Sequence, residues 1–292
     1  MEIAGSIWII IAGSLVACTC ALLGSFLVLR RMAMVGDAIA HAVLPGIVIA
    51  FLISGSKASL PVLIGAAATG MLTTLIIELL HKKGGLQEDA SIGISFTFLF
   101  SVGIILISVF AGQVELDQDC VLNGEIDQLP IDIGWSLFNL EIPRNLWTIF
   151  PSFLLILAFV SFGFKRLQIT TFDPEFAAAV GIQVGLWHYL LMGAVSLTTV
   201  VSFEAVGAIL VVAFLVIPPS TAYLITNKLK PMLILSCIFA VISVILGYYL
   251  AVTLNSSSAA CMAVCSGLLF IMVLIVTTIA KKKSKVLLMY EN

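Results

Sequence analysis

Long apolar runs separated by short polar connectors make up almost the whole chain. Each run holds about 20 residues, which is the length that an α-helix needs to cross a bilayer core. Open sheets do not form in lipid, and the runs are too long for the strands of a membrane barrel. The pattern therefore predicts an all-α membrane protein with about nine transmembrane helices, at residues 6–29, 34–54, 60–80, 91–112, 146–164, 186–203, 205–226, 231–253 and 259–280.

The expected number of helices falls to eight if the sixth and seventh runs are not separate spans. Only Glu204 and its neighbours divide them, so one run could be a broken or re-entrant helix. Glu204 is expected near the outer face, where it lines or gates an entrance, or is an ordinary turn residue. Pro218 and Pro219 remove two backbone donors and predict a bend or an end of the helix there, either as a hinge or as a static kink.

Composition narrows the class of protein further. Hydrophobic residues make up 61% of the chain and charged residues only 10%, whereas soluble domains carry about 25% charged residues. The first apolar run continues to Leu29, which is too long for a cleaved signal peptide and indicates a retained span.

No basic tract suggests nucleic acid as a partner, so the expected environment is membrane lipid. The chain has no G-x-x-x-x-G-K-[ST] phosphate loop and no H-E-x-x-H or G-x-S-x-G motif, so we expect a non-enzyme.

The connectors also predict the orientation of the chain. All but two of the 14 Lys and Arg residues fall in connectors on one side of the predicted spans. The two exceptions are Lys57 and Arg144. Because basic residues concentrate on the cytoplasmic side of a membrane, the N-terminus is expected outside and the C-terminus inside.

Two ionisable side chains, Asp37 and His41, lie within the second apolar run. Residues four apart share one face of a helix, and ionisable groups inside a membrane are costly and normally face a protein interior or a wet pathway. A carboxylate with an imidazole suits a first-row divalent metal. Pro45 lacks the N–H that would bond the His41 carbonyl, which frees a third possible ligand. The alternative is an internal Asp–His hydrogen bond that only stabilises packing.

Two ligands are not a full metal site, and a two-fold dimer would place the same pair opposite itself. A proton- or sodium-coupled transporter, or a membrane enzyme that uses Asp37 and His41 as acid and base, would explain the same pair differently. A transporter of that kind would work without an ATPase and without a docking helix.

Two connectors are more than turns. The outer connector at 113–145 is strongly acidic, which indicates either a vestibule that concentrates cations or an ordinary solvated loop. In the inner connector at 167–185, Asp173 can cap a helix, Pro174 suits its first position and Gly181 can end it. A short helix near 173–182 on the cytoplasmic side predicts a docking element for a partner.

Several of these segments together resemble the permease subunit of bacterial metal-ion ABC importers of the ABC-3 family, which carry manganese, zinc or iron. The resemblance is strongest in Leu29–Gly46, which reads Leu-Arg-Arg-Met-Ala-Met-Val-Gly-Asp-Ala-Ile-Ala-His-Ala-Val-Leu-Pro-Gly, and extends through Glu88–Gly93, Val206–Ala213 and Ile217–Ala222.

The resemblance implies a type II importer bundle in which residues 1–292 form a single transmembrane permease domain of the bacterial cytoplasmic membrane. A second permease subunit, either identical or a paralogue, would complete the pathway. A cytoplasmic ATP-binding subunit would hydrolyse ATP, and an extracytoplasmic protein would deliver the metal. The metal would be the substrate, with no permanently bound cofactor.

The resemblance also assigns roles to residues. Asp37 and His41 would be the metal ligands inside the membrane, and the helix after Asp173 would be the coupling helix that meets the ATPase. Its matching positions are Asp173, Pro174, Glu175, Ala178 and Gly181.

Two details bear on the metal and on its entry. Pro45 resembles the manganese and iron members of the family, whereas zinc members tend to lack this proline. Family members often carry a histidine in the outer loop, but here the stretch 117–124 has none. Asp119 and Cys120 are the candidate entry residues there, with Cys120 as a replacement for the histidine.

Overall fold

The computed structural model describes residues 2–54, 59–110, 126–127, 133–137, 140–143 and 145–290. In these ranges the backbone alone is described for 2–4, 59–60, 133–137, 140–142, 204 and 281–290. The elements in chain order are α1 (Glu2–Leu29), α2 (Val35–Ala42), α3 (Leu44–Ser54), α4 (Ser59–Lys82), α5 (Glu88–Phe110), β1 (Ile133–Leu137), β2 (Leu140–Pro143), α7 (Leu146–Phe172), α8 (Pro174–Ala179), α9 (Val184–Val206), α10 (Ala208–Ile225), α11 (Leu229–Leu254) and α12 (Ser258–Tyr290).

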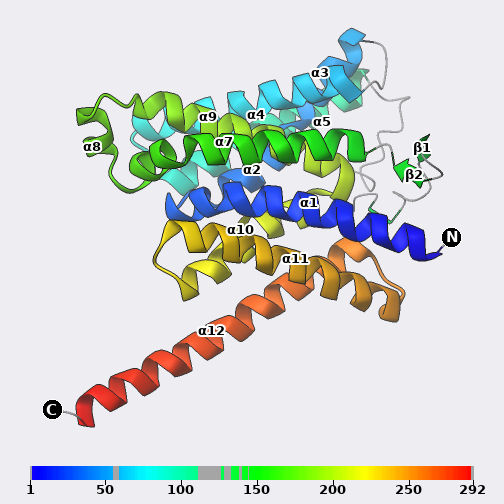
Figure 1. Cartoon of the computed structure of the whole chain (residues 1–292). Helices are drawn as coiled ribbons and strands as arrows, with labels where there is room; N and C mark the ends of the chain where they lie inside the picture. The colour runs from blue at the N-terminus through cyan, green and yellow to red at the C-terminus, as the bar shows by residue number, and fades with distance from the viewer. Residues whose placement is uncertain are drawn as a thin grey trace.

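Nine helical segments among the described residues are long and apolar enough to cross a bilayer, which confirms the predicted all-helical membrane fold. The second of these, Val35–Ser54, is built from α2 and α3 together. Figure 1 shows the N-terminus and the C-terminus at opposite ends of the bundle, as an odd number of crossings requires. The sequence did not predict the one sheet in the described part, an antiparallel pairing of β1 with β2.

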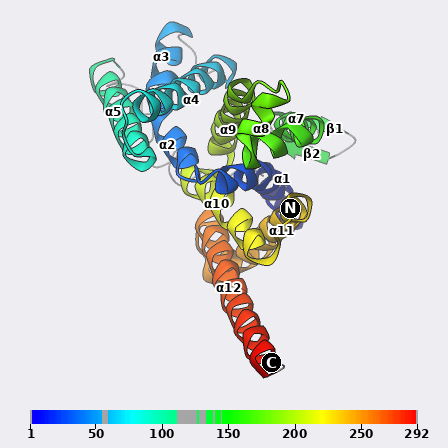
Figure 2. The same cartoon turned by 90° about the vertical axis from the view of Figure 1, so that its left-hand side faces the viewer.

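Helix α1 lies at the centre of the bundle, and it contacts α7, α9, α10 and α11. Its Leu23 and Phe26 are fully buried and belong to the same hydrophobic cluster as Phe214 of α10. Figure 2 shows α3, α4 and α5 gathered on one side of α1, and α7, α8 and α9 gathered on another. Helix α12 packs on α10 and α11 and then runs away from the bundle toward the C-terminus.

The boundary between the sixth and seventh spans is at Gly207. Helix α9 continues through Glu204 to Val206, and α10 begins at Ala208. The prediction that Glu204 separates the spans is therefore wrong by three residues. The chain breaks at Gly207 because its backbone has a φ of 81°, a conformation that only glycine adopts without strain.

Pro218 and Pro219 do not end a helix, because α10 runs through both of them to Ile225. Both prolines are buried. Since Pro219 has no N–H, the carbonyl of Leu215 lacks its usual helical partner. That carbonyl packs against Gly24 of α1, at a distance that leaves no room for a Cβ on Gly24. The two prolines thus allow a close contact between α1 and α10.

Candidate metal centre

Asp37 and His41 both belong to α2, a helix of only eight residues. Asp37 lies in its first turn and His41 in its last turn. Helices α2 and α3 meet at Val43, whose φ of −73° and ψ of −16° are themselves helical. The Val43 N–H donates to the Ile39 carbonyl, and the Val43 carbonyl accepts from the Ile47 N–H, both at 3.1 Å. The opening that Pro45 predicted is therefore limited to the His41 carbonyl, which has no helical donor because residue 45 is a proline.

The hydroxyl of Thr69 in α4 lies beside the junction of α2 and α3. Its Oγ1 lies 3.5 Å from the Val43 carbonyl oxygen and 3.0 Å from the carbonyl oxygens of Gly65 and Ala66. Gly46 and Gly65 let the backbones of α3 and α4 touch at the same level. The second span therefore packs closely against α4.

The two candidate ligands point toward each other. His41 Nε2 lies 3.5 Å from Asp37 Oδ1, which is longer than a normal N–H···O hydrogen bond of about 2.7–3.2 Å. Two donors that each lie about 2.1 Å from one metal ion are roughly 3.0–3.5 Å apart when the angle between them is tetrahedral or smaller. The spacing fits shared ligation of one ion better than a tight Asp–His hydrogen bond.

The surroundings of the pair are apolar. The His41 ring lies 5.8 Å from the Phe100 ring and 6.1 Å from the Phe96 ring, both on α5. The His41 and Asp37 side chains are 33% and 34% exposed in the single chain. Polar side chains at such a position in a membrane need contact with protein or water, because lipid cannot solvate them. The single chain leaves about a third of each side chain without such a contact.

No group of three or more His, Cys, Asp or Glu side chains in the described part of the chain could hold a metal ion. Asp37 and His41 therefore stand as a two-residue set, as the sequence indicated. Glu204 lies in α9 with only its backbone described, and Asp119 and Cys120 lie outside the described residues. The roles expected for these three residues therefore remain predictions.

Helix α8 forms as its sequence predicts. Asp173 Oδ1 accepts a hydrogen bond from the Phe176 N–H at 2.9 Å, and Pro174 occupies the first turn. Gly181 has a φ of 83°, and the Ile182 N–H donates to the Ala177 carbonyl at 2.9 Å. This is a glycine-terminated C-cap. The helix proper spans Pro174–Ala179, which is shorter than the predicted range 173–182.

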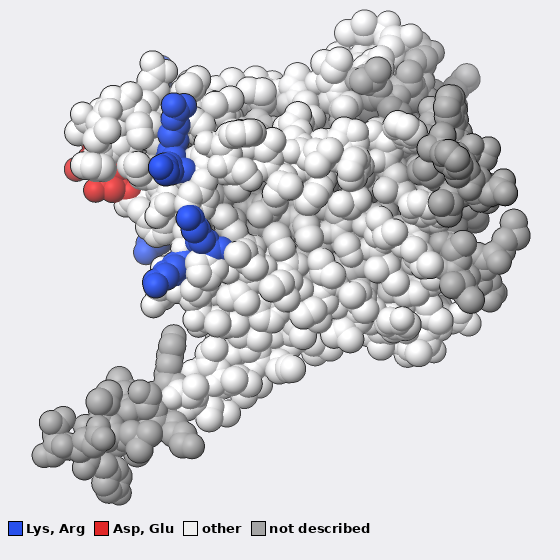
Figure 3. All heavy atoms as spheres, in the orientation of Figure 1, with Lys and Arg blue, Asp and Glu red and all other residues white. Residues whose placement is uncertain are grey.

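The exposed surface of α8 combines acidic and apolar groups. Ala177 is fully buried, while Glu175 and Ala178 are exposed. Three large apolar side chains are also exposed at this end, namely Phe172 (57%), Phe176 (54%) and Val180 (60%). Figure 3 shows that Lys and Arg side chains gather near the end of the molecule that carries α8. Arg166 and Lys230 belong to this end, above the rings of Trp187 and Phe164 respectively.

A polar cluster at the same end was not predicted as a site. Arg30, the residue after α1, donates from Nε to Thr171 Oγ1 at 3.1 Å and from Nη2 to Thr170 Oγ1 at 3.2 Å. Its Nη1 lies 3.4 Å from His188 Nδ1. Burial lowers the pKa of the Arg30 guanidinium, which nevertheless stays charged because arginine is not deprotonated in proteins.

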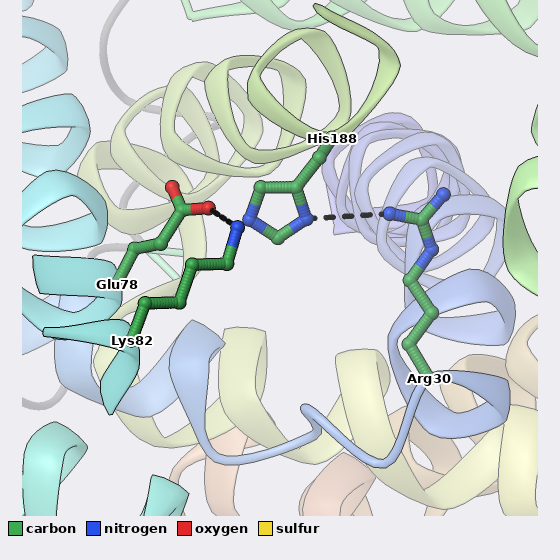
Figure 4. Close-up of polar contacts among 4 residues, drawn as sticks. All are labelled: Arg30, Glu78, Lys82 and His188. Atoms are coloured by element: carbon green, nitrogen blue, oxygen red, sulfur yellow. Dashed lines mark hydrogen bonds and ion pairs between the residues drawn. The ribbon is translucent and has the colours of Figure 1, made fainter. Parts of the chain in front are cut away.

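Glu78 and Lys82 of α4 form an ion pair on the other side of His188 (Figure 4). The cluster borders a cavity of about 660 Å³ whose lining includes Arg30, Glu78 and His188. The lining also includes Val35, two residues before Asp37, and Pro174 of α8. The cavity therefore lies between the candidate ligand helix and the candidate docking helix.

The His188 ring lies 5.6 Å from the ring of Tyr189 and also contacts Arg30. In the sequence, Arg30 is one of the basic residues that indicate the orientation of the chain. The one signal that could have singled it out is its place directly before the Asp37 segment.

Known proteins are similar to this chain over nearly its whole length. A protein-family model described as the ABC 3 transport family matches residues 6–277. The chain is 47% identical over 264 residues to the manganese transport system membrane protein MntD of Bacillus subtilis, and the alignment covers 90% of this chain and 89% of MntD. It is 40% identical over 262 residues to the zinc transport system membrane protein TroD of Treponema pallidum, which covers 90% of this chain and 71% of TroD.

A solved structure supports the same grouping. The fold is similar to a chain of PsaBC from Streptococcus pneumoniae in complex with Fab, with a TM-score of 0.75 and 31% sequence identity. The match covers 91% of this chain and 89% of that chain.

Proposed function

The chain belongs to the ABC 3 transport family, and on that premise we propose that it is the permease subunit of an ATP-driven importer for a divalent transition-metal ion. It is a multi-pass membrane subunit of an ABC transport system and not itself the ATPase. That membership contradicts the two alternatives, a secondary transporter and a membrane enzyme. Manganese is the favoured substrate, with zinc and iron after it.

The 3.5 Å approach of Asp37 Oδ1 to His41 Nε2 carries the proposal. A carboxylate oxygen and an imidazole nitrogen are ligands that manganese, iron and zinc all accept. They lie in a transmembrane segment in which Pro45 leaves the His41 carbonyl without a helical donor. A backbone carbonyl that is freed at membrane depth can act as a further ligand for a cation. Manganese is preferred because MntD is the most similar of the relatives named above and because Pro45 follows His41.

A second permease subunit completes the site in this proposal. Two side chains do not fill the coordination sphere of a transition metal, and a third of each is exposed on the single chain. An identical partner, or a paralogue with the same pair, would cover the face formed by α2 and α5 and contribute ligands of its own. The partner would also remove the cost of exposing Asp37 and His41 to lipid.

We assign the other two partners to the two ends of the bundle. The end that carries α8 bears most of the basic residues, so we place it in the cytoplasm, with the N-terminus outside. There the exposed side chains of Phe172, Phe176 and Val180 would dock α8 on the ATP-binding subunit. An extracytoplasmic binding protein would deliver the metal at the other end.

In the proposed transport cycle, the metal ligands, the ATPase and α8 each have one role. The metal enters from outside and is held by the ionised Asp37 carboxylate and the neutral His41 imidazole, since both ligands must be deprotonated to bind. ATP hydrolysis on the partner would then move α8, and with it the helices around the pair. This change would open the site to the cavity that is lined by Val35 and Arg30.

The test uses the assembled transporter in proteoliposomes and measures ATP-dependent uptake of Mn²⁺. Asp37→Asn and His41→Gln change the ligands at nearly constant size, and each is expected to lower uptake at least ten-fold. Asp89→Asn is the matched control for the carboxylate, because it makes the same change at an exposed position in the first turn of α5.

Competition by Zn²⁺ and Fe²⁺ ranks the substrates in the same assay. Uptake that persists at the control level in the Asp37→Asn, His41→Gln double variant would refute the ligand assignment. Uptake that is stronger for Zn²⁺ than for Mn²⁺ would refute the preference for manganese.

A further inference from the structure

The helices on either side of α8 are packed into one unit. Trp187 of α9 stacks on Phe159 of α7, with ring centroids 6.1 Å apart. Its indole leaves no room for a Cβ on Gly163 of α7, and Arg166 lies 5.5 Å above the ring. A displacement of α8 is therefore passed to the ends of α7 and α9 together.

Arg30 joins that unit to the helix that carries the candidate metal ligands. Its guanidinium contacts Thr170 and Thr171 in the last turn of α7, and His188 in the second turn of α9. The segment from Thr171 to His188 includes all of α8. We propose that Arg30 is a positioning residue that couples the movement of α8 to α2, and hence to Asp37 and His41. This inference rests on the proposed transport function.

The link from Arg30 to α2 is short and stiff. Helix α1 ends in a tight turn in which the Arg31 N–H donates to the Val28 carbonyl and the Met32 N–H donates to the Leu27 carbonyl. Arg31 has a φ of 63°, so the chain reverses at this residue. The Val35 N–H then donates to the Met32 carbonyl at 3.2 Å, and α2 begins. Such a turn has little freedom to absorb a displacement.

The chemistry of arginine suits this role. Its planar guanidinium carries five N–H donors in a fixed fork, and can hold two hydroxyls and one imidazole at once. A lysine would keep the charge and lose the fork. Thr170 is buried, and Arg30 is partly buried beside the cavity. The side chain of the neighbouring Arg31 is exposed and makes no hydrogen bond or ion pair with the described residues.

The experiment compares Arg30→Gln with Arg31→Gln in the complete transporter, reconstituted with its ATPase and its binding protein. The two variants remove the same charge from adjacent positions. Three quantities are measured: Mn²⁺ ions imported per ATP hydrolysed, Mn²⁺ binding to the ATP-free complex, and the midpoint of thermal unfolding. Arg30→Lys tests whether charge alone is sufficient. Thr170→Val with Thr171→Val removes two acceptors and leaves the arginine in place.

For Arg30→Gln we expect the number of Mn²⁺ ions per ATP to fall about ten-fold, the size of effect that the loss of a charge-assisted hydrogen bond produces in an equilibrium. Mn²⁺ binding and thermal unfolding should match those of Arg31→Gln, which should itself behave like the wild type. Arg30→Lys and the double threonine variant should show the same defect more weakly.

Equal import per ATP in Arg30→Gln and Arg31→Gln would overturn the proposal. So would a defect in Arg30→Gln that merely follows lost Mn²⁺ binding or a lowered unfolding midpoint, since Arg30 would then be only structural. If Arg30→Gln does not assemble, the double threonine variant decides, and a wild-type ratio there overturns the proposal. Failure of the transport function itself is distinguishable, because the wild-type complex would then import no Mn²⁺.

Discussion

Gly46 of α3 and Gly65 of α4 face each other so closely that a Cβ on either would strike the carbonyl oxygen of the other. This contact lies one residue beyond Pro45, which leaves the His41 carbonyl without its helical donor. The absence of two side chains therefore determines how near α3 comes to α4.

The first prediction follows from this contact. Gly46→Ala and Gly65→Ala should each lower the free energy of unfolding by about 1–3 kcal/mol, because overpacking forces the two backbones apart. The measurement is the midpoint of thermal unfolding of the purified protein. Gly93→Ala is the control, since a Cβ there meets no atom within 4 Å and alanine favours the helix by up to about 1 kcal/mol. A Gly46→Ala protein as stable as Gly93→Ala would contradict the packing.

The second prediction concerns the joint between α9 and α10. Gly207 has φ 81° and ψ 164°, a region that is essentially restricted to glycine and costs other residues about 1–3 kcal/mol. Gly207→Ala should therefore destabilise the protein or shift the joint, as seen in the unfolding midpoint and in hydrogen exchange of residues near the joint. Gly185→Ala, in the first turn of α9, has open space around its Cβ and should be neutral or slightly stabilising. Equal midpoints for the two variants would show that the joint is not strained.

The elements that depend on local chemistry were predictable from the sequence. Nine spans follow from apolar run length, and the cap at Asp173 and the end of α8 at Gly181 follow from residue type. The freed His41 carbonyl follows from the missing N–H of Pro45. For the cap, the glycine end and this carbonyl, the deciding interaction lies within about four residues along the chain.

Features that depend on contacts between distant helices were not predictable. Arg30 bonds to Thr170 and Thr171 across about 140 positions of sequence, and the pattern around Arg30 resembles any basic helix end. Pro218 and Pro219 predicted a bend or an end of the helix, as a hinge or a static kink, but α10 runs through both of them, and the freed Leu215 carbonyl packs on Gly24. Tertiary packing thus overrode the local preference.

The third prediction tests docking at α8. Phe176→Glu places a charge on an exposed apolar side chain of α8, and should abolish co-purification of the ATP-binding subunit, because that charge would be desolvated in the interface. Leu86→Glu is the control, since Leu86 is also an exposed apolar residue, in the connector between α4 and α5 at the same end. Co-purification that survives Phe176→Glu as well as it survives Leu86→Glu would place the ATPase elsewhere.

A related change weakens α8 and leaves its exposed apolar side chains in place. Asp173→Ala removes the side chain that accepts the Phe176 N–H, and the loss of an N-cap costs about 0.5–2 kcal/mol. A smaller loss of ATPase binding is expected than in Phe176→Glu, and Asp173→Asn should restore it, because asparagine caps helices as well as aspartate does. An Asp173→Asn protein that binds as poorly as Asp173→Ala would show that the carboxylate charge, and not the cap, is what matters.

The last prediction is the pH dependence of Mn²⁺ binding to the purified complex in the absence of ATP, which separates the site from the pH response of the ATPase. Protonation gives His41 a positive charge and removes a lone pair, and protonation of Asp37 removes a negative charge, so both oppose the metal. Since histidine titrates near pH 6.5 in the absence of perturbation, affinity should fall as the pH is lowered from about 8 to 5. His41→Gln cannot take up that proton, so its weak residual binding should lose this dependence, while His81→Gln keeps it. Wild-type affinity that is constant from pH 8 to 5 would mean that no imidazole takes part in binding.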